Sequence, residues 1–197
     1  MEQPARLTAT DLACRRGDRV LFRGLSFSLG ETKALQVIGP NGTGKSSLLR
    51  ILAGLLRPFE GKVECNRQMA LLDERLPLDG DLSLGRALRF WCDVDGIGFL
   101  ARESAADDLG LTNLLDVPVR YLSTGQRKRA AILQSNSRMA GVWLLDEPLN
   151  GLDVDAATEF QQRVAAFLAE GGIAVIASHQ AFDVAGLERL HLADFAA

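Results

Sequence analysis

Hydrophobic and polar positions alternate in short runs over the first third of the chain. Each run has the length of a strand and is separated from the next by residues that favour turns or solvent. One run, Ala34 to Ile38, is almost wholly apolar, as in a strand covered on both faces. The N-terminal part is therefore predicted to be β-rich, with strand material at residues 7–13, 19–22, 25–29, 34–38, 61–65 and 69–72.

The spacing of apolar residues changes near Asp79, where a helical period replaces the alternation. Apolar side chains recur three and four positions apart from Leu82 to Trp91, and a second such pattern runs from Phe99 to Leu109. We expect residues of about 79–140 to form a mostly helical subdomain. It would be inserted into a single domain that spans residues 1–197.

The C-terminal third returns to strands and helices in alternation. Apolar runs at 141–145 and 173–177 flank a helical pattern over residues 155–169. This order predicts an α/β fold with a mainly parallel sheet and helices on its faces. Ligands of such sheets bind at the carboxyl ends of the strands, so the polar residues after each run are candidates for a site.

A glycine-rich loop follows the 34–38 strand and leads directly into a helical pattern. Glycines let the backbone curl around a phosphate chain, and the helix that begins near Lys45 adds the positive end of its dipole. Lys45 can reach the β- and γ-phosphates of a nucleotide, and the Ser46 hydroxyl can ligate Mg²⁺. A plain glycine turn is the alternative, but strand, loop and helix occur in the order that a P-loop requires. The predicted nucleotide-binding residues are Gly39, Pro40, Asn41, Gly42, Thr43, Gly44, Lys45, Ser46 and Ser47.

Two further apolar runs also end in polar residues. The 141–145 run is followed by Asp146 and Glu147, and the 173–177 run by His179 one residue later. Asp146 can hold Mg²⁺ through its water shell, and Glu147 can polarise a water for attack on the γ-phosphate. Taken alone, the acidic pair could equally be a helix N-cap and the histidine a core residue. The P-loop upstream favours the catalytic interpretation, in which Asp146, Glu147 and His179 face the same site as the P-loop.

A second helix start carries hydroxyl groups and basic residues. Ser123 is a suitable N-cap for a helix that runs to about Met139, and the loop before it presents hydroxyl and N–H groups. These groups predict a second anion site. The alternative is a capped helix whose basic residues form a solvated face.

Composition narrows the function classes. The chain has 197 residues, of which 47% are hydrophobic and 24% charged, as expected for a globular domain. Its net charge of −3 argues against a nucleic-acid partner held by general electrostatics. Three widely spaced cysteines and two histidines do not suggest zinc, and an odd cysteine count without a secretory segment indicates a reducing compartment. No apolar run approaches the roughly 20 residues of a membrane span, so another chain would have to supply any spans.

Together, these motifs resemble those of the ABC ATPases and follow the family's order. Gly39–Ser46 is similar to the Walker A loop, Val142–Pro148 to Walker B, Gly151–Asp153 to the D-loop, and His179 to the switch histidine. The signature usually written LSGGQ is matched by Leu122, Ser123, Thr124, Gly125 and Gln126. The resemblance covers about residues 7–192. It implies an α/β P-loop NTPase fold of the ABC type, with a β-rich N-terminal part and an inserted helical subdomain.

The resemblance also implies an ATPase that uses ATP and Mg²⁺ and works as a homodimer or pseudo-dimer. Two such domains would meet head to tail, so that the signature of one closes on the γ-phosphate held by Walker A of the other. Glu147 would activate the water, His179 would hydrogen-bond the γ-phosphate, and Asp153 would lie in the D-loop. The chain has one copy of each motif and therefore resembles half of a working unit.

Three positions depart from the family pattern. Thr124 replaces the second glycine of the signature and adds a side chain near the trans phosphate. The family's adenine-stacking aromatic is replaced by Arg16, whose guanidinium could stack on adenine or remain solvated. The Q-loop glutamine expected after the 69–72 strand is missing, and Glu74 is the nearby residue that could contact Mg²⁺.

Residues 20–27, 47–55 and 87–91 are most similar to the small ATPases of c-type cytochrome biogenesis, the heme exporter A family. That resemblance implies a peripheral ATPase on the cytoplasmic face of the bacterial inner membrane. Its partner would be a polytopic permease of the CcmB type, with a CcmC-like subunit as a further candidate. Two alternatives stay open: the ATPase of another ABC transporter, and a soluble ABC ATPase without a membrane partner.

Overall fold

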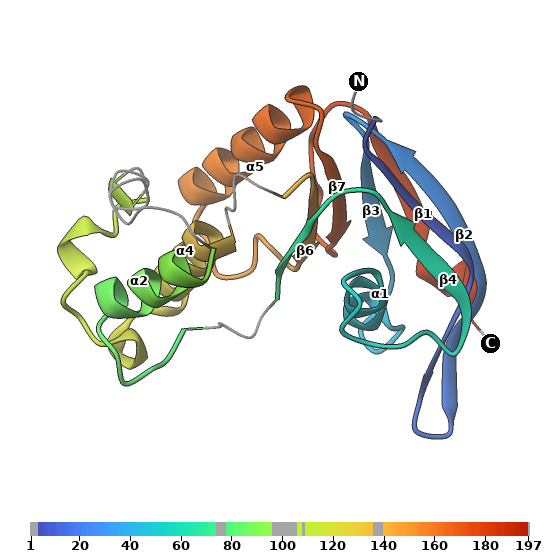
Figure 1. Cartoon of the computed structure of the whole chain (residues 1–197), viewed down its shortest axis with the longest axis horizontal. Coiled ribbons are helices and arrows are strands. Elements are labelled where there is room, and N and C mark those ends of the chain that lie inside the picture. Colours follow the sequence, from blue (N-terminus) through green and yellow to red (C-terminus); the bar gives the residue numbers. More distant parts are fainter. Residues whose placement is uncertain (1–3, 74–77, 96–105, 108, 136–139, 197) are drawn as a thin grey trace. The chain divides into compact units, whose positions relative to one another are not determined.

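The protein divides into two compact units. The computed structural model describes residues 4–73, 78–95, 106–107, 109–135 and 140–196. The first unit comprises Met1–Asp73, Met139–Asn150 and Val154–Ala197, and the second Glu74–Arg138 and Gly151–Asp153. The first unit holds the sheets and the second is helical (Figure 1).

The N-terminal sheet of the first unit has three antiparallel strands in the order β2-β1-β4. Their bounds are β1 Arg6–Arg16, β2 Arg19–Gly30 and β4 Glu60–Cys65. The sequence pattern predicts two strand segments on either side of Arg23-Gly24, but β2 is one continuous strand. Its register against β1 shifts there, and Gly24 has a φ of 70°. A bulge therefore accommodates the turn-like dipeptide without ending the strand.

The second sheet of this unit is parallel throughout, which confirms the predicted α/β class. Its order is β5-β6-β7-β3-β8. The bounds are β3 Ala34–Ile38, β5 Met69–Leu72, β6 Val142–Asp146, β7 Ile173–Ala177 and β8 Leu187–His191. Strand β8 was not predicted, because its charged and largely exposed sequence gives little periodic signal at a sheet edge.

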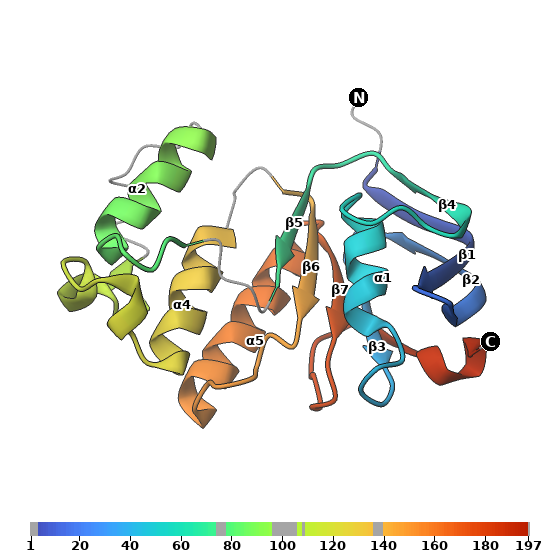
Figure 2. The ribbon, with the colours of Figure 1, turned by 90° about the horizontal axis from the view of Figure 1, so that it is seen from below.

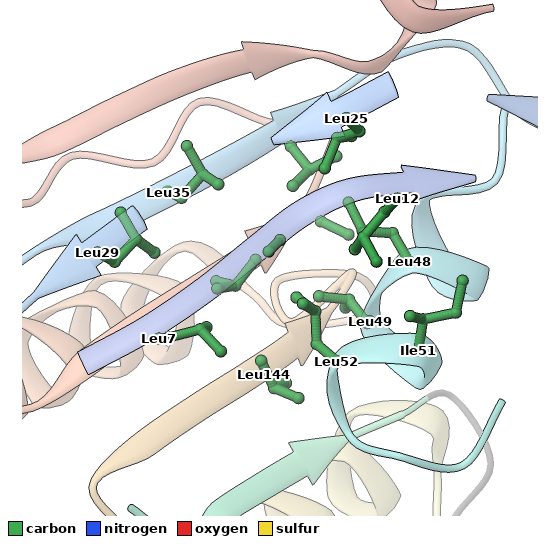
Figure 3. Packing of buried hydrophobic residues seen from close by; sticks show 14 of the residues in the cluster. Leu7, Leu12, Leu25, Leu29, Leu35, Leu48, Leu49, Ile51, Leu52 and Leu144 are labelled. Carbon is green, nitrogen blue, oxygen red and sulfur yellow. The ribbon is translucent and has the colours of Figure 1, made fainter. Parts of the chain in front are cut away.

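Helix α1 (Lys45–Leu52) is covered by strands of both sheets, as Figure 2 shows. One face of the helix is apolar, and its four buried leucine and isoleucine side chains meet Leu7 and Leu12 of β1 and Leu144 of β6 (Figure 3). Each such side chain contributes about 1.5–3 kcal/mol when fully buried. The helix and the loop before it are therefore fixed firmly to the first unit.

Helix α5 (Val154–Ala169) packs against β7 through Phe160, Val164 and Leu168. The rings of Trp143 in β6 and Phe167 in α5 are stacked, with centroids 4.1 Å apart. A short 3-10 helix, η3 (Leu192–Phe195), ends the described part of the unit.

The second unit contains α2 (Leu84–Asp95), α4 (Thr124–Ser135) and two 3-10 turns, η1 (Thr112–Leu114) and η2 (Val119–Tyr121). Helices α2 and α4 pack together. Most of the helix predicted from Phe99 to Leu109, and the predicted end of α4 near Met139, lie outside the described residues. No helix in the described ranges is long and apolar enough to cross a membrane.

Candidate functional site

The glycine loop between β3 and α1 is held in a conformation that its sequence explains. Gly44, the residue before α1, has a φ of 108°. A Cβ at this position would lie 3.2–3.3 Å from side-chain atoms of Leu21 and Phe22. The Thr43 hydroxyl donates to the Pro40 carbonyl at 2.9 Å. Glycine is therefore needed at position 44 for both backbone angle and space, because side chains of strand β2 lie close to it.

The first turn of α1 presents a lysine and unsatisfied N–H groups. No side chain among the described residues caps the start of this helix, so its first amides are available to an anion. Lys45 is 7% exposed, and its ammonium donates to the carbonyls of Gly39 at 2.7 Å and Pro40 at 3.4 Å. Ser46 is exposed beside it. The loop thus combines a buried positive charge with a helix N-terminus, as a triphosphate requires.

Asp146 and Glu147 stand at the carboxyl end of β6. Asp146 is 4% exposed and lies opposite Ala177 of β7 in the sheet. Glu147 has a φ of 44°, in the left-handed region that few residues other than glycine adopt, and its N–H donates to the Ala177 carbonyl at 2.8 Å. Such a conformation costs about 1–3 kcal/mol and is concentrated at functional sites. It turns Glu147 away from the strand while the backbone stays anchored to β7.

His179 and Glu147 come together in the first unit. The Nδ1 atom of His179 lies 3.0 Å from Oε2 of Glu147. The histidine side chain is 58% exposed and the glutamate side chain 12%. The histidine therefore faces solvent at the strand ends rather than the core, as a residue that contacts a ligand must.

A network of hydrogen bonds fixes the loop that carries His179. The Gln180 side chain donates to Asn150 Oδ1 at 3.1 Å, and its backbone N–H donates to Ser178 Oγ at 3.1 Å. From β3, the Gln36 amide donates to the Gln180 carbonyl at 2.8 Å and to the Ser178 carbonyl at 3.5 Å. Sequence reasoning missed Gln36. Its signal was a single amide inside an apolar strand, since a buried polar group needs a partner.

The donor set at these strand ends fits Mg²⁺. Asp146 supplies a buried carboxylate, and Ser46 a hydroxyl on α1, which packs against β6. Both are oxygen ligands, which this hard ion prefers. Within the described ranges no three acidic, histidine or cysteine side chains form a metal cluster. Nucleotide-bound Mg²⁺ needs none, because phosphates and waters complete its shell.

The signature segment begins α4 in the second unit with a reciprocal cap. The Ser123 hydroxyl accepts from the Gln126 N–H at 3.2 Å, and the Gln126 side chain accepts from the Ser123 N–H at 2.8 Å. This is a capping box, so Gln126 shares the capping predicted for Ser123 alone. Leu122 is 2% exposed and anchors the turn.

Gly151, Leu152 and Asp153 pack beside this helix start in the same unit. A Cβ on Gly125 would lie 3.0 Å from the Gly151 carbonyl, and one on Gly151 would lie 3.1 Å from the Thr124 methyl group. The extra side chain of Thr124 therefore leans toward the D-loop segment. Glycine at 125 and 151 allows the two backbones to approach closely.

The roles of all the predicted site residues remain predictions, and for two of them, Arg16 and Glu74, the described residues show no contact that supports the role. Arg16 is exposed at the end of β1, beside the turn at Gly17. Its neighbour Arg15 is the one whose guanidinium covers an aromatic ring, that of Phe59, at 4.6 Å. Glu74 lies outside the described residues.

Comparisons with known proteins identify the family. The ABC transporter family profile matches residues 22–150. The cytochrome c biogenesis ATP-binding export protein CcmA of Novosphingobium aromaticivorans is 54% identical over 98% of both chains. The chain belongs to the CcmA family of ABC transporter ATP-binding proteins. CcmA of Sphingopyxis alaskensis is 47% identical over 93% of this chain and 95% of its own.

A candidate ABC transporter ATP-binding protein from Pyrococcus furiosus shares the fold of this CcmA-family chain. Its solved structure superposes with a TM-score of 0.83 at 20% identity and covers 98% of this chain and 100% of that one. These matches confirm the predicted family, the ABC ATPase fold and the cytochrome c biogenesis subfamily. The protein is thus an ATP-hydrolysing ABC transporter subunit.

Proposed function

We propose that this CcmA-family chain powers heme export or release of the heme-loaded chaperone during cytochrome c maturation. It would act on the cytoplasmic face of the inner membrane, bound to a CcmB-like polytopic permease with a CcmC-like subunit as a further partner. The 54% identity to a cytochrome c biogenesis CcmA, over nearly the whole of both chains, carries this proposal. No membrane-spanning helix occurs among the described residues, so the permease would have to supply the spans.

Within the first unit, Lys45 and the free amides of α1 would bind the β- and γ-phosphates. The Lys45 ammonium would exchange the carbonyls of its own loop for phosphate oxygens, which carry full negative charge and form stronger hydrogen bonds. Mg²⁺, held by Ser46 and through water by Asp146, would neutralise charge on the phosphate oxygens.

Glu147 would accept a proton from the attacking water. Its neighbour His179 lies within 3.0 Å and would orient this carboxylate through Nδ1. We assign the other ring nitrogen, Nε2, to the γ-phosphate. The imidazole of His179 would then contact both Glu147, the general base, and the γ-phosphate that hydrolysis releases.

The signature of a second copy would complete the site. Ser123, with the amides at the start of α4, presents a capped helix end that suits an anion. In a head-to-tail dimer this helix end would face the γ-phosphate held by Lys45 of the other chain. Hydrolysis would then require two copies, while nucleotide binding requires one.

Substitution of Glu147 tests the catalytic assignment. Glu147→Gln should retain ATP binding, because its shape is unchanged. It should lower steady-state hydrolysis by about 10²- to 10⁴-fold, because the proton acceptor is lost. Phosphate release by the chain purified with its membrane partner is the measurement, with bound fluorescent ATP analogue as the control. Unchanged phosphate release would refute the role of Glu147.

Co-purification tests the cellular role. Extraction of membranes with detergent should recover the chain with a polytopic partner, and Glu147→Gln should stop cytochrome c maturation in cells that depend on this chain. Recovery of the chain without any membrane protein, or normal maturation with the variant, would argue for another role.

A further inference from the structure

The strand that leads into the P-loop carries an amide side chain in the core of the first unit. Gln36 is 2% exposed and lies in the middle of β3, between Ile176 of β7 and Arg189 of β8 in the sheet register. Its neighbours on the strand, Leu35 and Val37, are buried hydrophobic residues. Burial of an amide is unfavourable unless its hydrogen bonds are satisfied, and an apolar side chain would fill the same space without this cost. Stability alone therefore does not explain a glutamine here.

The hydrogen bonds of Gln36 converge on one short loop. Its Nε2 atom donates to the carbonyl of Gln180 at 2.8 Å and lies 3.5 Å from the carbonyl of Ser178. These two carbonyls flank His179. The amide therefore holds the backbone on both sides of the histidine, although the imidazole itself is more than half exposed and gains little support from packing.

The same loop is tied to the segment that carries Glu147. Gln180 donates from its side chain to Asn150, whose backbone N–H donates to the Glu147 carbonyl at 3.2 Å. A chain of hydrogen bonds thus runs from Gln36 to the loop that carries His179, and from that loop through Asn150 to the backbone of Glu147. Its first member lies on the strand that leads directly into the Walker A loop.

We propose that Gln36 is a positioning residue for ATP hydrolysis: it fixes the 178–180 loop so that His179 meets Glu147 and the γ-phosphate. This inference rests on the roles proposed above for His179 and Glu147. Gln36 is buried, and its hydrogen bonds go to the loop backbone, so it would act through the loop. Because β3 also carries the Walker A loop, the amide gives the switch histidine a fixed position relative to the phosphate-binding residues.

The variant Gln36→Met tests the proposal, since methionine keeps the length of the side chain and removes the donor. Leu35→Val is the matched control: it disturbs the neighbouring position of the same strand without touching the loop. ATP hydrolysis is measured with the full-length chain and its membrane partner. For Gln36→Met we expect kcat to fall roughly 10- to 100-fold, as for a misplaced catalytic group, with KM nearly unchanged. Leu35→Val should show kcat close to wild type at matched folded fraction.

Imidazole NMR reports on the loop directly, because the chain has two histidines, His179 and His191. In Gln36→Met the His179 ring signal should broaden or move toward the position of a free histidine, while the His191 signal stays in place and reports an intact fold. An unchanged His179 signal together with wild-type kcat would overturn the proposal. Equal losses of kcat in Gln36→Met and Leu35→Val would also overturn it, because they would indicate a purely structural effect.

Two further measurements separate the possible failures. In the wild-type chain the side-chain amide protons of Gln36 should exchange slowly with solvent, and exchange as fast as in an exposed glutamine would refute the bond without any variant. His179→Ala should itself lower kcat. If His179→Ala has the wild-type kcat, the proposed catalytic role of His179 fails. If His179→Ala has a lowered kcat while Gln36→Met has the wild-type kcat, only the positioning role of Gln36 is rejected.

Discussion

An ion pair joins the P-loop helix to the strand from which the chain enters the second unit, and its removal should destabilise the first unit. Arg50, in the last turn of α1, donates from Nε at 3.1 Å and from Nη2 at 2.6 Å to Oδ2 of Asp73, directly after β5. Asp73 is the last described residue before the chain enters the second unit. The variants Arg50→Ala and Asp73→Asn remove one partner each.

The expected cost follows from the burial of the pair. The two side chains are 27% and 17% exposed. Exposed pairs contribute about 0.2–1 kcal/mol, and loss of one partner from a fully buried pair costs about 3–5 kcal/mol. This half-buried pair lies between these limits, so we expect a coupling energy of about 1–2 kcal/mol. For a chain of this length, each kcal/mol lowers the melting temperature by about 2–4 °C.

A double-mutant cycle measures this coupling. The free energy of unfolding is determined in urea for the wild type, Arg50→Ala, Asp73→Asn and the double variant, and the interaction energy is the departure from additivity. Arg50→Lys is the matched control, because it keeps the charge and loses the forked geometry, so it should recover only part of the stability. A coupling below about 0.3 kcal/mol, the usual scatter of additive pairs, would refute the reasoning.

Three other outcomes are expected. Gly44→Ala should abolish binding of a fluorescent ATP analogue in equilibrium titrations. The backbone there has a φ of 108°, which residues with a Cβ rarely adopt, and the added Cβ would crowd side chains of β2. Full affinity would contradict this account of the loop. Ser123→Arg and Lys45→Ala chains should each be inactive, and their mixture should regain at most one working site per dimer in a phosphate-release assay; full wild-type activity would count against the head-to-tail arrangement. With a thiol-specific disulfide reagent, Cys65 should react before the buried Cys14, since burial raises the pKa of the Cys14 thiol. Labelling followed by mass spectrometry would show the order, and equal rates would be inconsistent with this burial.

Local sequence was sufficient to predict the elements that bear the chemistry. The P-loop and the polar residues after β6 and β7 follow short apolar runs, and each signal lies within about ten residues. Because parallel strands present their carboxyl ends at one edge, the prediction that Glu147 lies near His179 needed only the strand order of the fold class, and the 3.0 Å contact agrees with it.

Contacts between distant segments were beyond this reasoning. Gln36 and Gln180 are 144 positions apart, and Arg50 and Asp73 are 23 apart. No periodicity links such pairs. The continuous strand β2 was missed for a related reason: Arg23-Gly24 looks like a turn locally, and only its pairing with β1 shows that the dipeptide forms a bulge. Hydrogen bonds between segments that are distant in the sequence determine these features, and local sequence patterns carry no information about them.

The hydrogen bonds of Lys45 indicate which part of a nucleotide the P-loop recognises. Its ammonium is buried and donates to two carbonyls of its own loop, so this charge has hydrogen-bond partners before a nucleotide arrives. A triphosphate must compete with these bonds, and only a ligand with anionic oxygens offers a stronger partner than a neutral carbonyl. This competition favours ligands with a phosphate chain, whatever the base. It is consistent with an arginine at position 16, where the family has an adenine-stacking aromatic residue. If phosphates supply most of the affinity, GTP should bind nearly as tightly as ATP, whereas adenosine should not compete measurably with a fluorescent ATP analogue. Tight adenosine binding would place the recognition on the base and contradict the argument.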